Sequence, residues 1–515
     1  MGYTWSFSTS ADGQSASAFR ILAFIGEDAV CQGYTFDILL LVENLKEEDA
    51  PAFLQAMAEA ATHTLTGSTN ETSVLSFAWS GMPERVEWMF AATGGGAVLR
   101  VLLRPHSFKL RHSVHSRIFL GVTPPKLLEY LLIREGLSSN ADFVAGLKTT
   151  YKSRPLSCQY NESAFDFLQR HLERLGGYSY IDQNAGKSRL VLADDGTTVP
   201  ALTGRSALDW DPTTTTDTAF VVFSFVRTMA TSATSVTLRD YCTEKPGSEA
   251  QTYTPPAVTI NGGGGNGGSG SGGNGSGGNG SGDSSYAPLR GGGAINLHGR
   301  FNMFGEVNNN TYSASDAQAQ ALLMAKARAR SLVSLSNRIR GASTVAWMRA
   351  GYYFTLSNKS YQLLSVSHAC NCRVDSVIDV TNISRAIVLG FPFNISQAGY
   401  SNSFVCHPLE LGAYAPEAAT PRPVVSGLMQ ATIYASSDAG SYADLDVKGR
   451  YTVSFPFAEA VYDANNAAVG SSATVPLRLM QIHAGKNSGI HFPLLGNTEA
   501  LVAFTDGDPD RPVIL

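Results

Sequence analysis

Long apolar runs are absent from this chain of 515 residues. Its uninterrupted apolar stretches, such as residues 38–42 and 219–223, are far shorter than the roughly 20 residues that a membrane-spanning helix needs. We therefore expect no transmembrane segment and no stable insertion into a membrane.

Cysteine is also scarce, with six residues in the whole chain. They are Cys31, Cys158, Cys242, Cys370, Cys372 and Cys406. Six scattered thiols in a chain of this length do not form a disulfide framework, so we expect most of them to be buried as apolar residues. Residues 1–6 lack the basic start and apolar core of a secretory signal. The sequence thus predicts synthesis and folding in a reducing cytoplasm.

Charge is low, and no excess of basic residues is present. Charged residues make up 16% of the chain and its net charge is -5, which gives no electrostatic reason to bind nucleic acid or an anionic membrane. A hydrophobic content of 43% is typical of a folded protein. At roughly 100–200 residues per domain, the length predicts about three to four units.

One segment has almost no side chains to bury. Residues 262–282 contain only glycine, asparagine and serine. Such a composition predicts a flexible linker or surface insertion spanning roughly 25 Å. The regularly placed aspartates of a calcium-binding glycine repeat are lacking there.

Upstream of this segment, β-rich runs alternate with two helices. The runs that predict strands are residues 19–24, 34–42, 98–103, 188–192, 220–226 and 235–238. One helix is predicted over residues 123–136, with two prolines in its first turn. Ser163 and Asp166 form a capping pattern for a second helix, which should end at Gly176.

Downstream, the pattern predicts the longest helix of the chain. Ser315 and Gln318 form a second capping pattern, and the helix should run to about Arg340 with Gly341 as its stop. Strands are predicted over residues 353–356 and 362–366, and Pro416, Pro421 and Pro423 mark a connector into a last β-rich unit. That unit should end with a strand over 499–504, a turn over 505–510 and a return strand over 511–515.

Several motifs occur in the order in which one known family has them. They are SRIF at 116–119 with the helix after it, CQYNES with DFL at 158–168, VTLRDY at 236–241, an Ala- and Arg-rich helix at 317–340 followed by GYYFTL at 351–356, GRYTV at 449–453, and GDPDRP at 507–512. This collinear set resembles the VgrG proteins, the spike and hub of the bacterial type VI secretion system and relatives of contractile-phage baseplate hubs.

The resemblance implies a mainly β protein with α-helices. It would contain two tube-type β-barrels with an inserted α+β domain, followed by an OB-fold β-barrel. The implied units are residues 1–113 and 205–261 for the first barrel, 114–204 for the inserted domain, 262–282 for the linker, 283–412 for the long helix and second barrel, and 424–515 for the OB-fold neck.

The function implied is that of a homotrimeric hub in a contractile injection machine. It would cap the hexameric tube protein, convert sixfold to threefold symmetry, contact baseplate proteins, and carry a PAAR-type spike-tip protein and effectors. It would assemble in the bacterial cytoplasm and then be secreted or injected into target cells. Two alternatives stay open: the hub of a phage-derived tail, and a hub that bears a cell-wall hydrolase.

Four groups of polar residues could be read as chemical sites, and a structural reading is favoured for each. Glu162 with Asp166 is read as part of a helix cap, and the His368, Cys370 and Cys372 cluster as a strand with buried thiols rather than a zinc site. Asp506, Asp508 and Asp510 are read as a turn rather than a calcium loop, and the basic residues from Lys326 to Arg340 as a solvated helical face. We therefore predict no catalytic, cofactor-binding or metal-binding residues and no enzyme activity, although a Ser, His and Asp brought together by folding stays open.

The chain ends on the apolar residues Val513, Ile514 and Leu515. The resemblance implies a trimeric β-helical needle after the OB-fold unit. We accordingly expect Leu515 to mark a truncation or a point beyond which the native chain continues.

Overall fold

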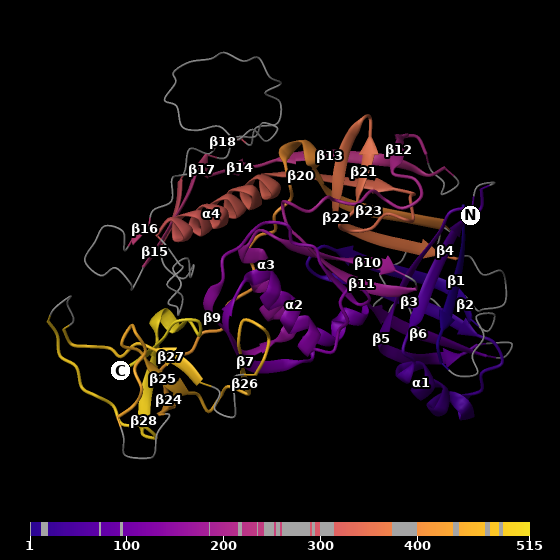
Figure 1. Cartoon of the computed structure of the whole chain (residues 1–515). Coiled ribbons are helices and arrows are strands. Elements are labelled where there is room, and N and C mark those ends of the chain that lie inside the picture. Colours follow the sequence, from indigo (N-terminus) through magenta and orange to yellow (C-terminus); the bar gives the residue numbers. More distant parts are fainter. Residues whose placement is uncertain are drawn as a thin grey trace, which may run out of the picture.

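The computed structural model describes most of the chain. The described residues are 2–11, 19–71, 74–92, 96–184, 186–214, 219–233, 235–241, 314–372, 399–435, 442–468, 474–483 and 488–515, together with four short strands between 252 and 298. The Gly-rich segment 262–282 lies outside them, so its flexibility stays a prediction. In the described part, strands predominate over helices, in agreement with the predicted mainly β class (Figure 1).

The largest sheet has twelve strands arranged as two runs of six. The first run, in spatial order, is β1 (Tyr3–Thr9), β4 (His63–Thr69), β5 (Ser76–Ala91), β6 (Ala97–Arg104), β3 (Gly33–Val42) and β2 (Phe19–Ala29). The second is β22 (Lys359–Asn371), β21 (Tyr353–Leu356), β12 (Ala207–Trp210), β13 (Val221–Met229), β20 (Asn337–Ser343) and β23 (Gly399–Pro408). Because β23 also pairs with β22, the second run closes into a ring.

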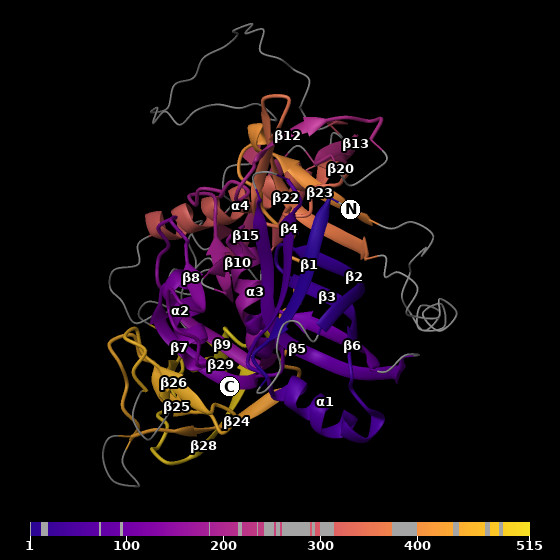
Figure 2. The same ribbon diagram turned by 90° about the vertical axis from the view of Figure 1, so that its right-hand side faces the viewer.

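The two runs meet where β2 pairs with β22, a contact that we call the seam. The strands are antiparallel there, with residues 23–29 opposite residues 365–371. These partners are more than 330 positions apart in the sequence. The seam therefore joins β2, which precedes the Gly-rich segment, to β22, which follows it, in one continuous sheet (Figures 1 and 2).

Most predicted strands are present, and the two shorter helices are where the sequence placed them. The β-rich runs correspond to β2, β3, β6, β11 (Lys187–Ala193), β13, β15 (Ser235–Tyr241), β21 and β22. The helices are α2 (Pro124–Arg134) and α3 (Ala164–Arg174). A further helix, α1 (Ala50–Glu59), and the 3₁₀ turn η2 (Glu47–Asp49) connect strands of the first run, and the 3₁₀ turn η3 (His106–Arg111) leads from β6 to β7 (Val114–Val122).

The longest helix is shorter than predicted. Helix α4 covers Ala314–Ser336, and the residues after it form strand β20. In β20, Asn337 and Ile339 are buried whereas Arg338 and Arg340 are exposed, which is the two-residue period of a strand. Gly341 is not a helix stop but lies within β20, where a side chain would collide with the ring of Phe404.

Residues 205–229 belong to the second run, whereas the implied division gave residues 205–261 to the first barrel. β12 pairs in parallel with β21 and β13, and β13 pairs with β20. β15 pairs outside the large sheet, with β16 (Thr252–Tyr253), β17 (Val258–Thr259) and β19 (Ala294–His298), and β14 (Thr231–Ser232) pairs with β18 (Leu289–Arg290). The other domain boundaries stay predictions.

An α+β part is inserted in the sequence between strands β6 and β12 of the large sheet. It contains α2, α3 and two small sheets: β10 (Tyr178–Asn184), β11 and β8 (Phe143–Ala145), and the sheet of β7 (Val114–Val122), β9 (Arg154–Ser163) and β26 (Ala460–Tyr462). β26 comes from the far end of the chain and pairs in parallel with β7. One strand of the inserted part is thus borrowed from the C-terminal unit.

The C-terminal unit (yellow in Figure 1) is a five-stranded sheet. Its strands, in spatial order, are β27 (Thr474–Leu477), β25 (Tyr451–Ser454), β24 (Leu428–Ile433), β28 (Glu499–Phe504) and β29 (Pro512–Ile514). β28 and β29 pair antiparallel across η7 (Thr505–Gly507), as the sequence predicted. The edges approach each other, because the N–H of Met480 donates to the carbonyl of Ile514 at 2.7 Å.

Two large apolar cores follow this division. The first fills the space between the large sheet and α2 and α3, and its largest fully buried side chains include Trp79, Trp347, Phe36 and Phe167. The second lies inside the C-terminal unit but also takes in Ile118, Leu156 and Cys158 from β7 and β9. The inserted part and the C-terminal unit therefore share a core. In the described residues, no helix has both the length and the apolarity needed to cross a bilayer.

Candidate functional site

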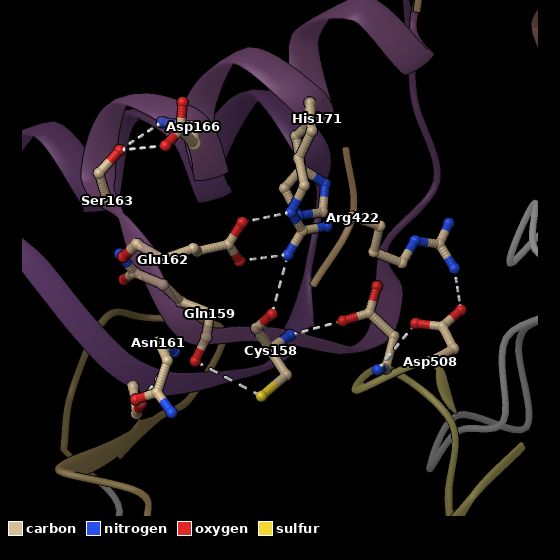
Figure 3. A network of polar contacts seen from close by, with 12 residues as sticks. Cys158, Gln159, Asn161, Glu162, Ser163, Asp166, His171, Arg422 and Asp508 are labelled. Carbon is tan, nitrogen blue, oxygen red and sulfur yellow. Dashed lines mark hydrogen bonds and ion pairs between the residues drawn. The ribbon is translucent and has the colours of Figure 1, made fainter. Parts of the chain in front are cut away.

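The residues of the CQYNES segment and of the closing GDPDRP turn meet in one buried polar network. Figure 3 shows β9 and α3 on one side and the turn between β28 and β29 on the other. We call this network the junction, because it joins the inserted part to the C-terminal unit. Sequence analysis gave its two halves separate roles and did not foresee that they touch.

Helix α3 is positioned by the cap that the sequence predicted. Ser163 has an extended backbone, and its Oγ accepts a hydrogen bond from the N–H of Asp166 at 3.0 Å. Its hydroxyl also donates to Oδ2 of Asp166 at 2.7 Å. Such a cap satisfies an N–H that the first helical turn would leave without a partner, so β9 passes directly into α3 in a fixed direction.

A buried ion pair ties α3 to β9. Nε and Nη2 of Arg170 donate to the two carboxylate oxygens of Glu162 at 2.8 and 2.7 Å, and Nη2 also donates to the carbonyl of Cys158 at 2.9 Å. Burial raises the pKa of Glu162, although Arg170 opposes this effect. Because both side chains are almost completely buried, removing either partner would leave an uncompensated charge.

The C-terminal turn docks onto the same strand. Oδ1 of Asp510 accepts the N–H of Cys158 at 2.7 Å, and Oδ1 of Asp508 accepts the N–H of Asp510 at 3.1 Å. Arg422, in the connector before β24, pairs with the carboxylate of Asp508. Burial, reinforced by the charge of Asp510, raises the pKa of Asp508 to about 6.

The junction contains a thiol and an imidazole, but neither is set up for catalysis. Burial raises the pKa of Cys158 well above its ordinary value, so its thiol stays protonated and unreactive. Burial and the neighbouring Arg170 and Arg154 hold the pKa of His171 far below its usual range. Nδ1 of His171 accepts from Arg154 at 2.9 Å, so that nitrogen is not a free base.

A second contact joins the same two units beside β26. The N–H of Ser116 donates to Oε1 of Glu459 at 3.0 Å, and Nδ1 of His115 lies 2.8 Å from Oε2 of Glu459. Burial alone would raise the pKa of Glu459, but these hydrogen bonds lower it. Ser113 links Nε2 of His115, at 2.8 Å, to the carboxylate of Glu135. Glu135 is also bound by Arg117 at 2.7 Å.

The connector between the large sheet and the C-terminal unit is fixed by the end of α3. The N–H and hydroxyl of Thr420 both donate to the carboxylate of Glu173 at 2.9 Å. Gln169 donates to the same carboxylate at 3.0 Å. One helix therefore holds β9, the connector and, through Glu162 and Cys158, the C-terminal turn.

The structure separates the first pair that sequence analysis had considered. Asp166 caps α3 and Glu162 binds Arg170, so they do not form an acid–base pair. Arg170 had been given no role, and Asp510 had been read only as a turn residue.

The His368 cluster is a strand with buried side chains, as favoured. Nδ1 of His368 lies 2.6 Å from the hydroxyl of Tyr400, and burial lowers the pKa of His368 to about 3. Cys370 is buried and Cys372 is half-buried. Within the described ranges, no group of three or more His, Cys, Asp or Glu side chains is arranged to hold a metal ion. The absence of functional sites from the whole chain stays a prediction.

The remaining two interpretations need correction. Asp508 and Asp510 are not only turn residues but buried ligands of Arg422 and Cys158. The basic helix is not simply a solvated face, because Arg330 pairs with Asp195 at 2.6 Å and the alanines beside it are buried. Arg338 and Arg340 belong to β20.

Comparison with known proteins identifies the fold. The chain is 26% identical over 506 residues to the type VI secretion system spike protein VgrG5 of Pseudomonas aeruginosa, covering 96% of this chain and 55% of that protein. It is 25% identical over 513 residues to VgrG4b of the same organism, covering 99% and 55%. The chain thus spans about half the length of these relatives.

Solved structures agree on the architecture. A type VI secretion component of Escherichia coli, described as similar to the bacteriophage T4 tail proteins gp27 and gp5, superposes with a TM-score of 0.58 at 16% identity and covers 99% of this chain and 98% of that one. A chain of the Francisella PdpA–VgrG complex gives a TM-score of 0.55 at 9% identity, covering 100% and 70%.

The family model of the phage tail baseplate hub (GPD) matches residues 27–371. This range includes the end of β2, the β22 side of the seam, and the inserted part except β26. The chain therefore belongs to the phage tail baseplate hub family, within which it resembles the VgrG spike proteins of type VI secretion systems.

Proposed function

We propose that this chain forms the hub and neck of a type VI secretion spike, with three copies capping the end of a sixfold inner tube. The observation that carries the proposal is the pair of six-stranded runs joined at the seam. Each chain offers two comparable strand assemblies side by side, so three chains offer six. Sixfold contacts on one face and threefold contacts elsewhere then follow from one homotrimer.

Each run is proposed to be one of the two tube-type barrels. Closure of the second is supported by the pairing of β22 with β23. Closure of the first is supported by ring contacts between its end strands. The rings of Trp5 in β1 and Phe24 in β2 are 4.6 Å apart, and those of Phe7 and Phe19 are 5.4 Å apart.

The C-terminal unit is proposed to be an OB-fold neck. Its five strands and the contact of residues 478–480 with Ile514, which links the two edges, support this assignment. The junction would hold the neck at a fixed angle to the hub. A rigid joint is what a spike needs when a contracting sheath drives it forward, because a flexible one would bend under load.

Trimer formation is supported by the apolar surface of the C-terminal unit. Thirteen of the eighteen large apolar side chains that are exposed in the described part lie in this unit. They are Val424, Leu428, Tyr434, Tyr442, Leu445, Val447, Met480, Ile482, Ile490, Phe492, Leu495, Leu501 and Leu515. Such a concentration marks a surface that another protein covers. The proposed cover is the same unit of two further copies.

The partners proposed are the hexameric tube protein, baseplate proteins, a spike-tip protein and effectors. Assembly would take place in the bacterial cytoplasm, followed by secretion or injection. A second candidate is the hub of a toxin-bearing spike. It is favoured by the similarity to the actin cross-linking toxin VgrG1 of Vibrio cholerae, which is 27% identical over 414 residues that cover 79% of this chain and 31% of that protein.

Electron microscopy of the full chain mixed with purified tube protein tests the proposed docking. Threefold particles seated on the ends of sixfold tubes are expected. Tubes whose ends remain bare at saturating concentrations of this chain would contradict the proposal. A matched control is tube protein alone, which fixes the frequency of capped ends in the absence of the hub.

A further inference from the structure

Two cysteines lie at one end of the seam. Cys370 is on β22, opposite Phe24 of β2 and Tyr400 of β23. Cys372 follows the last residue of β22, Asn371, and its N–H donates to the carbonyl of Leu22 at 3.0 Å. Both residues therefore sit where the two six-stranded runs are joined.

The two thiols face each other. Their Sγ atoms are 3.6 Å apart, which is contact distance for two sulfur atoms that are not bonded. Cys370 is buried, whereas Cys372 is only half-buried and packs at the edge of the main core. A small oxidant can thus reach Sγ of Cys372 from solvent, and the buried Sγ of Cys370 lies next to it.

The neighbouring histidine does not turn this pair into a metal site. The ring of His368 is committed to Tyr400 through Nδ1. It also packs against the rings of Trp79 and Phe36, at centroid distances of 5.1 and 5.5 Å. The chemistry open to the two thiols is therefore that of a dithiol rather than of a zinc ligand set.

We propose that Cys370 and Cys372 form a redox-active dithiol, which closes to a disulfide in an oxidising compartment and opens again in a reducing one. The half-buried Cys372 is the attacking thiol, and the buried Cys370 is the resolving thiol. The oxidant is a small disulfide of the glutathione class. This site is separate from the buried thiols Cys158 and Cys406.

The reaction is thiol–disulfide exchange in two steps. The thiolate of Cys372 attacks oxidised glutathione, so that one glutathione thiolate leaves and a mixed disulfide forms on Cys372. The thiolate of Cys370 then attacks Sγ of Cys372, and the second glutathione leaves. The two cysteines lose two electrons and two protons, which oxidised glutathione takes up to become two molecules of reduced glutathione.

The closed bond should be strained and easily reduced. Sulfur atoms in a disulfide are about 2.05 Å apart, so the two Sγ atoms must approach from their present separation. The backbone has to bend at Asn371, and Cys372 can move because it lies beyond the paired strand. A loop of this size adds little stability, and strain makes a disulfide more oxidising. The bond would form outside the cytoplasm and be reversed inside it.

The reactivity of this cysteine pair does not depend on the proposed function. The moment at which the disulfide would form does rest on that proposal. A spike that is assembled in the cytoplasm and then expelled passes from a reducing to an oxidising environment. Bending at Cys372 also removes its hydrogen bond to Leu22, which lies at this end of the seam. Oxidation would therefore mark expelled molecules and loosen that end of the seam.

The test is peptide mapping of the full chain after equilibration with mixtures of oxidised and reduced glutathione. Oxidising mixtures should yield a peptide containing both cysteines that has lost two hydrogen atoms and resists alkylation. Reducing mixtures should restore two alkylatable thiols. If both thiols stay alkylatable in oxidising mixtures, or if glutathione stays attached to Cys372, the proposal is wrong.

Two variants sharpen the test. Cys370→Ser should trap glutathione on Cys372, because the resolving thiol is missing. Cys31→Ala is the matched control, since Cys31 is also half-buried but lies away from the pair, and it should leave disulfide formation unchanged. A C370S chain that shows no glutathione adduct would overturn the assigned roles. A chain that forms the disulfide but never trimerises would refute the proposed function and leave this inference intact.

Discussion

The large sheet and the C-terminal unit differ in how far their large apolar side chains are exposed. In the large sheet, Trp79, Phe36 and Trp347 are fully buried and packed ring against ring. In the C-terminal unit, Val447 and Ile482 are 94% and 84% exposed. The sheet buries its largest described apolar side chains within one chain, whereas the C-terminal unit leaves apolar surface that further copies are proposed to cover. The buried side chains of the sheet thus stabilise the fold, and the exposed side chains of the C-terminal unit are proposed to serve assembly.

The two regions also differ in the charges they bury. The large sheet encloses histidines whose pKa burial lowers, to about 3 for His368 and about 4 for His407. The junction encloses a carboxyl group whose pKa burial raises, to about 6 for Asp508. The same physical cause, loss of hydration, therefore gives opposite responses to acid in the two kinds of group, and each region also holds one group of the other kind, Asp28 in the sheet and His171 in the junction.

The largest effect is expected from breaking the core of the sheet. Trp79→Ala removes a fully buried ring that packs against Phe36 and Phe77, so the free energy of unfolding should fall by about 3–5 kcal/mol. Denaturant unfolding followed by tryptophan fluorescence measures this. Trp210→Ala, at a partly exposed position on β12, is the control and should cost far less. Equal losses in the two variants would contradict the burial pattern.

The next largest effect is expected from breaking the junction. Arg170→Met leaves the carboxylate of Glu162 buried without its partner and should lower the free energy of unfolding by about 3–5 kcal/mol, with earlier proteolytic release of the C-terminal unit. The double change Arg170→Met with Glu162→Leu should restore most of the loss, because the carboxylate of Glu162 is then no longer left buried without its partner. Arg205→Met, in an exposed pair with Asp209, serves as control. A double variant as unstable as R170M would sink this explanation.

Lowering the pH should change the stability of the two regions by different amounts. Lowering the pH from 7 to 5 protonates the unfolded histidines but not His368 or His407, so the stability of the sheet should fall by about 2–3 kcal/mol after the opposing contribution of Asp28. Asp508 binds its proton more tightly in the folded state, so its contribution to stability is present below its unfolded pKa and is lost as the pH rises through about 6. Asp508 should thus stabilise the junction between pH 7 and 5, whereas His171, whose pKa burial lowers, opposes this gain, so the junction should lose less stability than the sheet.

Hydrogen exchange at the two pH values, corrected for the intrinsic exchange rate, measures the protection of backbone amides in both regions in one experiment. Protection should decrease more in β22 and β23 than in β29. Asp508→Asn is the control, since it removes the contribution of Asp508 to the pH response of the junction and leaves the response of the sheet unchanged. A uniform loss of protection in both regions would be incompatible with this assignment.

The smallest effect concerns the connector. Thr420→Val removes the hydroxyl that donates to Glu173 but keeps the N–H bond, so about 1 kcal/mol of stability should be lost. The measurement is the shift in urea midpoint at constant slope. Thr498→Val, whose hydroxyl bonds to a nearby carbonyl in an exposed loop, is the matched control. An unchanged midpoint for T420V would show that the hydroxyl does not help to hold the connector.

Local features were predictable because their signals are local. The cap of α3 depends on Ser163 and Asp166, three positions apart, and the β28–β29 turn depends on adjacent Gly, Asp and Pro residues. The end of α4 was predicted wrongly because Arg338 and Arg340 suit the end of a helix as well as the exposed face of a strand. Pairing across the sheet, not propensity, decided that case.

Contacts between distant segments were not predictable. The seam joins residues more than 330 positions apart, and Cys158 meets Asp510 from the other end of the chain. Neither pairing leaves a trace in local composition. The family resemblance supplied the order of the units, but only the structure shows that the two most specific motifs, around residues 158–168 and 507–512, bind each other.

The most direct test of the account is the mass of the full chain in solution, measured by native mass spectrometry together with sedimentation. The account predicts a trimer for the unchanged protein. It predicts a folded monomer when Val447 and Ile482 are both replaced by serine. An unchanged protein that stays monomeric under every assembly condition, or a serine variant that trimerises as tightly as the original, would contradict it.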